Sequence, residues 1–135
     1  MTTVLTTAEK NRQLVLNLYA AMRNADLEGF FASCSPDLVL HEAESMKVGG
    51  TYRGREEITG CFAQLLSGYN VATIDVKRIV ADGEYVVGMV SFMTSGSTPH
   101  EVSLTEWWHI LDGKVVEIRP FYWDTEALNK VLAEQ

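Results

Sequence analysis

Apolar residues recur at two different spacings along this chain, and the spacing changes near residue 70. Before that point they return every three or four positions in three separate stretches, a pattern typical of helices with one buried face. After it they return at about every second position, which is typical of strands. The sequence therefore predicts helices in its first half and a series of strands in its second.

The helices have recognisable starts. Thr6 and Glu9 form a capping-box pattern ahead of the first helix, and Asp26 is placed to cap a short second helix that Pro36 is expected to end. Gly49–Gly54 is expected to be a loop before a third helix, and Asp124-Thr125 to cap a short terminal helix. The residues predicted to be buried on these helices are Leu14, Val15, Leu18, Tyr19, Met22, Leu27, Phe30, Phe31, Ile58, Phe62, Leu65, Leu66, Leu128, Val131 and Leu132.

Strands are predicted at 38–42, 71–81, 84–95, 100–111 and 115–123. Asp82-Gly83 and Asp112-Gly113 are dipeptides favoured in tight hairpin turns. Helices followed by a long antiparallel meander predict an α+β fold, in which helices pack on the concave face of a curved sheet.

The last two strands are apolar on both faces. Residues of one parity are Trp108, Ile110, Ile118 and Tyr122, and residues of the other are Trp107, Leu111, Phe121 and Trp123. A sheet that is apolar on both sides needs two covers. The helices supply one, so we expect a second copy of the chain to supply the other, as a homodimer through the convex face. The alternative is a set of scattered exposed aromatic residues.

Composition narrows the class of protein. With 135 residues and 47% hydrophobic content, the chain is expected to form one globular domain over 1–135. No apolar run is long enough to span a membrane and no secretory signal is evident, so we expect a cytoplasmic protein. A net charge of −7 with scattered cations argues against nucleic-acid binding. Cys34 and Cys61 are expected to be buried free thiols, with a disulfide as the alternative.

Three polar residues occupy positions where such a domain normally places its core: Tyr19, Glu42 and Glu106. A buried, charged and unpaired carboxylate costs several kcal/mol, about the stability margin of a small domain, so stability alone does not explain it. Glu42 has the parity of Leu38 and Leu40, and Glu106 has the parity of Trp108. Both acids are therefore predicted to face one inner cavity, where they and a phenol could transfer protons.

Several segments resemble the superfamily of nuclear transport factor 2, ketosteroid isomerase and the SnoaL-like polyketide cyclases. The resemblance covers nearly the whole chain. The segments that carry it are Leu18–Met22, Asn24–Gly29, Asp37–Glu42, Gly50–Ile58 and Ile110–Val116. It implies a cone-shaped, cystatin-like α+β barrel. Its members include isomerases, cyclases, dehydratases, epoxide hydrolases and binding proteins, so the fold is indicated more specifically than the function.

The ketosteroid isomerases within that superfamily imply roles for the three residues. Tyr19 falls on their oxyanion-binding tyrosine, Glu42 on their general base, and Glu106 on the protonated carboxyl that serves as their second oxyanion donor. Both acids are Glu here where that family has Asp. The resemblance implies a cofactor-independent isomerase or cyclase acting on a small apolar carbonyl compound, such as a polyketide or a terpenoid or steroid-like intermediate. The alternatives are an epoxide hydrolase or dehydratase, and a non-catalytic domain that binds a small ligand.

Each assignment has a simpler alternative. Glu42 could end its strand in solvent, Glu106 could pair with Arg119, and Tyr19 could be ordinary core. The expected substrate-binding wall is aromatic and methionine-rich, which suits a flat apolar ligand; it comprises Tyr52, Tyr69, Met89, Met93, Trp108 and Tyr122. No metal site is expected, because His41 and His109 have the opposite parity to the acids and His100 lies in a loop.

Overall fold

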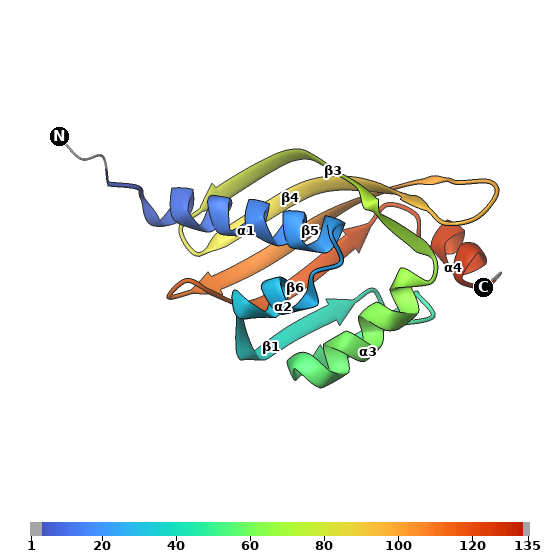
Figure 1. Ribbon diagram of the computed structural model, residues 1–135, viewed down its shortest axis with the longest axis horizontal. Coiled ribbons are helices and arrows are strands. Elements are labelled where there is room, and N and C mark those ends of the chain that lie inside the picture. The colour runs from blue at the N-terminus through green and yellow to red at the C-terminus, as the bar shows by residue number, and fades with distance from the viewer. Residues whose placement is uncertain (1–3, 134–135) are drawn as a thin grey trace.

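A computed structural model describes residues 4–133 of the chain, and these form four helices and six strands (Figure 1). The helices are α1 (Thr7–Arg23), α2 (Leu27–Ala32), α3 (Gly54–Leu66) and α4 (Thr125–Ala133). The strands are β1 (Cys34–Glu42), β2 (Gly50–Arg53), β3 (Tyr69–Asp82), β4 (Tyr85–Thr94), β5 (Glu101–Leu111) and β6 (Lys114–Tyr122). None of the described helices is long and apolar enough to cross a membrane.

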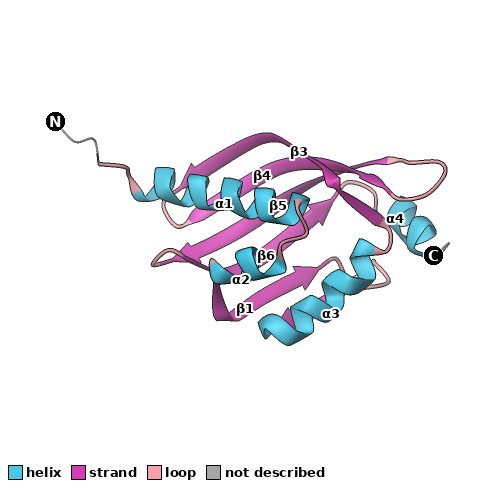
Figure 2. Ribbon diagram, viewed as in Figure 1, coloured by secondary structure: helices cyan, strands magenta, loops and turns pink. Residues whose placement is uncertain are grey.

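All six strands belong to one curved sheet in the order β2-β1-β6-β5-β4-β3 (Figure 2). The strands from β3 to β6 form the predicted antiparallel meander, whereas β1 joins the sheet parallel to β6. The first three helices lie across one face of this sheet (Figure 1). The α+β class and the placement of the helices on the concave face are thus confirmed.

The helix starts follow the predicted capping chemistry. Thr6 accepts a hydrogen bond from the backbone of Glu9, and the Glu9 side chain accepts one from the backbone of Thr6. Asp26 accepts from Gly29 at the start of α2, and Asp124 accepts from the backbone of Ala127 at the start of α4. These side chains satisfy backbone N–H groups that have no partner inside the helix.

The core fills the space between the helices and the concave face. Its fully buried members include Val15 and Leu18 on α1, Phe30 on α2, Ile58 on α3 and Trp108 on β5. Contacts of α1 with β3 and β4, and of α3 with β1, join the two layers. Cys34 and Cys61 are both buried and unpaired, as predicted. The core ends at a hollow lined by the predicted acids.

Three boundaries differ from the predictions. Pro36 does not follow α2 but lies within β1, at the irregularity between Cys34 and Val39 where pairing with β6 is interrupted. A proline is tolerated there because no ladder hydrogen bond needs its missing N–H. Residues 50–53, predicted as loop, form the edge strand β2 against β1. The β3–β4 turn consists of Gly83 and Glu84, one residue later than predicted, because Asp82 still pairs with Tyr85.

The convex face carries large apolar side chains in the described residues. Trp107 is 52% exposed and Trp123 is 88% exposed, and the Trp107 ring lies 4.7 Å from that of Phe121. We name the following exposed residues the convex patch: Tyr85, Met89, Trp107, Leu111, Phe121 and Trp123. The alternation predicted from the sequence is therefore present, with one apolar face under the helices and the other open.

Candidate active site

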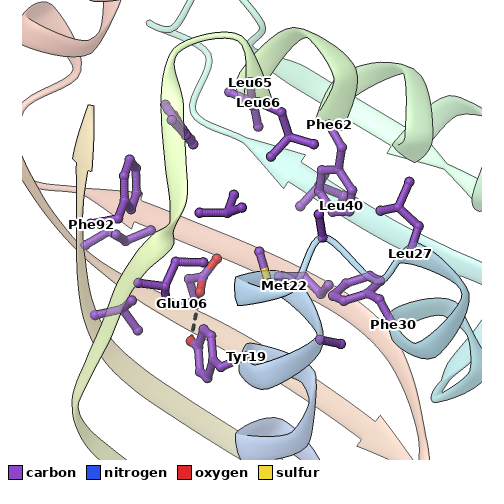
Figure 3. Close-up of a pocket in the computed structure, with 18 of the residues that line it drawn as sticks. Tyr19, Met22, Leu27, Phe30, Leu40, Phe62, Leu65, Leu66, Phe92 and Glu106 are labelled. Carbon is purple, nitrogen blue, oxygen red and sulfur yellow. Dashed lines mark hydrogen bonds between the residues drawn. The ribbon is translucent and has the colours of Figure 1, made fainter. Parts of the chain in front are cut away.

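A small cavity of about 90 Å³ lies between the concave face and the helices. Its wall is almost wholly apolar, with side chains from α1, α2, α3 and the strands β1, β3, β4, β5 and β6. Figure 3 shows Met22, Leu27 and Phe62 on one side, with Glu106 and Tyr19 pointing toward each other on another. Its opening to the surface is marked by the exposed residues of the wall, which are Ala25, Asp26 and Leu66.

Glu106 lies on the inner side of β5 and is 9% exposed. The Tyr19 hydroxyl donates a 2.8 Å hydrogen bond to its Oε1, and the Trp108 indole N–H donates a 3.1 Å bond to the Tyr19 oxygen. The Tyr19 and Trp108 rings also meet edge to face. Because Trp108 can only donate, the single hydroxyl hydrogen of Tyr19 is directed to Glu106.

Glu42 ends β1 on the same inner side and is 5% exposed. The Tyr122 hydroxyl donates a 3.3 Å hydrogen bond to its Oε2. Tyr69 lines the same cavity near Tyr122, and its buried hydroxyl makes no hydrogen bond of ordinary geometry among the described residues. The cavity thus holds two carboxyls, each bonded to one phenol, and a third phenol, that of Tyr69, beside Tyr122.

Burial makes both carboxyls weaker acids than usual. The pKa of Glu42 is raised to about 8: burial raises it most, the charge of Glu106 also raises it, and the hydrogen bond from Tyr122 lowers it. Burial also raises the pKa of Glu106 to about 7, against the lowering effect of the Tyr19 hydrogen bond. Desolvation favours the neutral form of an acid, and a neighbouring anion has the same effect.

No cation in the described part of the cavity wall offsets these two acids. The titratable groups of the wall are Tyr19, Asp26, Glu42, Tyr69, Glu106 and Tyr122. Burial, with the adjacent Glu106, raises the pKa of Tyr19, so its phenol stays protonated. With no cation nearby, the two carboxyls avoid a buried negative charge by binding protons. The pair can therefore take up or release a proton near neutral pH.

The residues that the sequence singled out fall into two groups. Tyr19, Glu42, Tyr69, Glu106, Trp108 and Tyr122 all line the cavity. Met89 does not, because it lies on the outward side of β4 opposite Thr105, within the convex patch, and the prediction that it forms wall is wrong. Met93 has the same parity as Met89 and is likewise absent from the wall. Tyr52 does not line the cavity either, since β2 is an edge strand and its hydroxyl donates to the backbone oxygen of Val48.

The simpler alternatives for the acids do not hold in the described structure. Arg119 pairs across the strands with Trp107, not with Glu106, and no ion pair of the described residues includes Glu106. Glu42 is buried and does not face solvent. His41 contacts Glu117 at 3.2 Å, and His109 contacts Glu84 at 3.2 Å, both on the side of the sheet away from the cavity.

Sequence reasoning missed part of the cavity wall and one glycine. Val90 and Phe92 line the cavity from β4, a strand whose inward parity is hidden because both of its faces are apolar. Gly88 belongs to the same inward set and lies opposite Glu106. A glycine inside an apolar strand is a signal of close backbone approach, and that signal was present in the sequence.

The fold and the cavity with its two carboxyls define a class of small α+β domains in which helices and a curved sheet surround an internal site. A family model described as a SnoaL-like domain matches residues 15–118. The chain therefore belongs to the SnoaL-like domain family. No curated protein matches the chain.

Solved structures share the whole fold at low sequence identity. A protein from Jannaschia sp. CCS1, named as a SnoaL-like polyketide cyclase, is 16% identical over 100% of this chain and 99% of its own, with a TM-score of 0.81. TerC, crystallised with polyporic acid, is 22% identical over 92% and 98%, with a TM-score of 0.80. A protein of unknown function with a cystatin-like fold from Xanthomonas campestris is 21% identical over 89% and 95%, with a TM-score of 0.76. These likenesses confirm the predicted fold.

Proposed function

We propose that this protein is a cofactor-independent acid–base enzyme, an isomerase or cyclase, acting on a small apolar carbonyl compound. The observation that carries the proposal is the pair of carboxyls, Glu42 and Glu106, in one apolar cavity with pKa values of about 8 and about 7. A general acid or base works best when its pKa lies near the operating pH. Two such groups in one cavity can take a proton at one point of a substrate and stabilise charge at another.

In the proposed mechanism Glu42 removes a proton from a carbon next to the carbonyl group. The electron pair moves to the carbonyl oxygen, which accepts a hydrogen bond from the protonated carboxyl of Glu106. Tyr19 supports Glu106 through the 2.8 Å bond to Oε1 and leaves Oε2 to serve the substrate. Return of the proton from Glu42 to another carbon completes an isomerisation. In a cyclisation the enolate carbon instead attacks a second carbonyl, and the oxygen of that carbonyl takes the proton from Glu42 to become a hydroxyl.

One proton shared by the two carboxyls, and held by Glu106, is the state this mechanism needs. The higher pKa of Glu42 places that proton on Glu42 in the empty cavity, so the mechanism requires the bound substrate to shift it to Glu106. At low pH both acids are neutral and Glu42 cannot act as a base, whereas at high pH both are charged and Glu106 cannot donate. We therefore expect a bell-shaped dependence of kcat/KM on pH with limbs that belong to the pair. The buried phenol of Tyr69, without a hydrogen bond of ordinary geometry among the described residues, gives a further donor for a substrate oxygen.

The choice of a small organic substrate has two supports. The wall beyond the acids is apolar and aromatic, which suits a hydrophobic molecule with few polar groups. Proteins with the same fold include one named as a SnoaL-like polyketide cyclase and one crystallised with polyporic acid. At about 90 Å³ the cavity is smaller than an engineered site of about 150 Å³ that holds benzene, so a larger substrate requires the helices around the opening to move outward.

The test is a kinetic panel of enolisable ketones and epoxides. It compares wild type with Glu42→Gln and Glu106→Gln, and with Glu44→Gln as the matched control, because Glu44 is exposed two residues further on. We expect turnover of a carbonyl compound that falls by roughly 100-fold or more in each cavity variant, the scale of a lost general acid or base, and is unchanged in the control. Equal turnover in all four proteins would contradict the proposal. Turnover of epoxides alone would instead identify a hydrolase, and binding without turnover a ligand-binding domain.

The proposed assembly is a homodimer through the convex patch. Its support is the exposed cluster around Trp107, Phe121 and Trp123, which is larger than the single exposed apolar residues common on monomers. The cavity opens on the opposite, helix-covered face, so a dimer through the patch leaves the site accessible.

A further inference from the structure

Gly88 stands directly opposite Glu106 in the pairing of β4 with β5, on the cavity side of the sheet. The nearest neighbour in the space where its side chain would be is the hydroxyl oxygen of Tyr19, far inside van der Waals contact. Two ring carbons of Tyr19, Cε2 and Cζ, would each be 3.0 Å from an added Cβ. The hydroxyl of Tyr19 therefore occupies the place of a missing side chain.

The backbone does not explain this glycine. Gly88 is absent from the glycines with positive φ, which are Gly50, Gly54, Gly83, Gly96 and Gly113, so an L-residue could adopt its conformation. A glycine in the interior of a strand weakens it, because no side chain packs against the neighbouring strands. Gly88 instead leaves space beside β4, and the Tyr19 hydroxyl, which bonds to Glu106, fills that space.

The Tyr19 ring has little freedom to move aside. It is 1% exposed, packs edge to face on Trp108, and accepts the indole hydrogen bond at 3.1 Å. A side chain at position 88 would push the hydroxyl off its place between Trp108 and Glu106. The 2.8 Å bond to Glu106 would be lengthened or lost.

We propose that Gly88 is a positioning residue of the acid pair, whose missing side chain seats the Tyr19 hydroxyl on Glu106 and so sets the affinity of that carboxyl for its proton. The role of Gly88 in catalysis rests on the proposed function. Its effect on the position of the Tyr19 hydroxyl does not, because that position is a property of the folded chain. The groups that face Glu106 from other elements are Tyr19 on α1, Glu42 on β1, Tyr69 on β3 and Tyr122 on β6. Of these, Tyr19 makes the hydrogen bond to Glu106.

The experiment is a carboxyl titration by NMR, with glutamate labelled at the side-chain carboxyl carbon and the Glu106 signal assigned by its loss in Glu106→Gln. The proteins are wild type, Gly88→Ala, Tyr19→Phe and the double variant. We expect Gly88→Ala and Tyr19→Phe each to raise the pKa of Glu106 by roughly one pH unit, the size of one lost hydrogen bond to a carboxylate. In the Tyr19→Phe background, which has no hydroxyl to displace, Gly88→Ala is expected to add no further shift.

Gly60→Ala is the matched control, because an added Cβ at Gly60 meets nothing within 4 Å. It should leave the Glu106 titration unchanged. An unchanged titration in a folded Gly88→Ala protein would overturn the inference, and so would an equal shift with and without the Tyr19 hydroxyl. If Gly88→Ala fails to fold and the double variant folds, the hydroxyl clash is the cause and the inference stands.

Failure of both Gly88 variants to fold would also overturn the inference, since the strand itself would then need the glycine. None of these readings depends on turnover. A protein without isomerase or cyclase activity can still show the predicted titration, and an active enzyme can fail to show it. The inference and the proposed function can therefore fail separately.

Discussion

Tyr122 donates a hydrogen bond of 3.3 Å to Glu42 across the parallel pair of β6 and β1, and this bond opposes the burial that raises the pKa of Glu42. Tyr19 has the same relation to Glu106 at 2.8 Å. Each acid of the pair is thus held by its own phenol, one from the first helix and one from the last strand. The bond to Glu106 is shorter than the bond to Glu42, so the two carboxyls are not in equivalent environments.

Tyr122→Phe is expected to raise the pKa of Glu42 further above its value of about 8, because the bond that stabilises the carboxylate is lost. The same NMR titration measures it. The stability cost should be about 1 kcal/mol, the net value of one buried hydrogen bond, as measured by urea unfolding. A pKa of Glu42 that stays constant or falls would show that Tyr122 does not act on it.

The stability of the fold is expected to fall as pH rises from about 4.5 toward 8. Both acids have folded-state pKa values above the ordinary 4.5, so the folded state binds more protons than the unfolded state in this window. Unfolding free energy then decreases with pH, and the full stabilisation is present only below the unfolded pKa. Urea unfolding at several pH values measures the slope.

The matched variants isolate the cause of that slope. Glu42→Gln and Glu106→Gln should each flatten it, because a neutral amide has no proton to lose, whereas Glu44→Gln, at an exposed position, should leave it as in wild type. Each of the three variants changes the formal net charge from −7 to −6, so Glu44→Gln controls for the change in overall charge. A slope that survives in both cavity variants would assign it to surface charge instead.

The two cysteines should resist modification in the folded protein. Cys34 and Cys61 are buried, and burial raises the pKa of each thiol to about 12, so little thiolate is present at neutral pH. Ellman's reagent should therefore find almost no reactive thiol in native protein and two in urea. Rapid reaction of one thiol under native conditions would mean that α3 or the start of β1 opens readily.

The convex patch should decide the oligomeric state. Light scattering of wild type is expected to give the mass of a dimer, and Trp107→Glu should give a monomer because it places a charge at the centre of an apolar contact. Leu66→Glu is the matched control, since Leu66 is also exposed but lies on the helix-covered face. A monomeric wild type would contradict the proposed assembly, as would a dimer that persists in Trp107→Glu.

Strand alternation predicted the inward direction of Glu42 and Glu106, because each shares its parity with large apolar neighbours that can only be core. The same alternation could not place Met89. Both faces of β4 are apolar, so the sequence of that strand does not say which side meets the helices. Only its cross-strand partner, Thr105, fixes the outward direction.

The prediction for Tyr52 fails for a different reason. Its strand has four residues at the edge of the sheet, next to glycines that are typical of a loop, and edge pairing depends on a partner that local sequence does not contain. The interpretation of Pro36 as a helix end is wrong for a related reason, since its tolerance within β1 depends on the interrupted pairing with β6. The positions of both Tyr52 and Pro36 thus depend on strand pairing between residues that are distant in the sequence.

The hydrogen bonds of the cavity join residues that are far apart in the chain: 87 positions separate Tyr19 from Glu106, 89 separate Trp108 from Tyr19, and 80 separate Tyr122 from Glu42. Such contacts require the chain to close large loops, so we expect them to form late and together during folding. No isolated hairpin or helix among the described residues contains a working half of the site. The titration of the paired acids is consequently a sensitive report on whether the whole domain has folded, and a locally folded intermediate should titrate like an ordinary peptide.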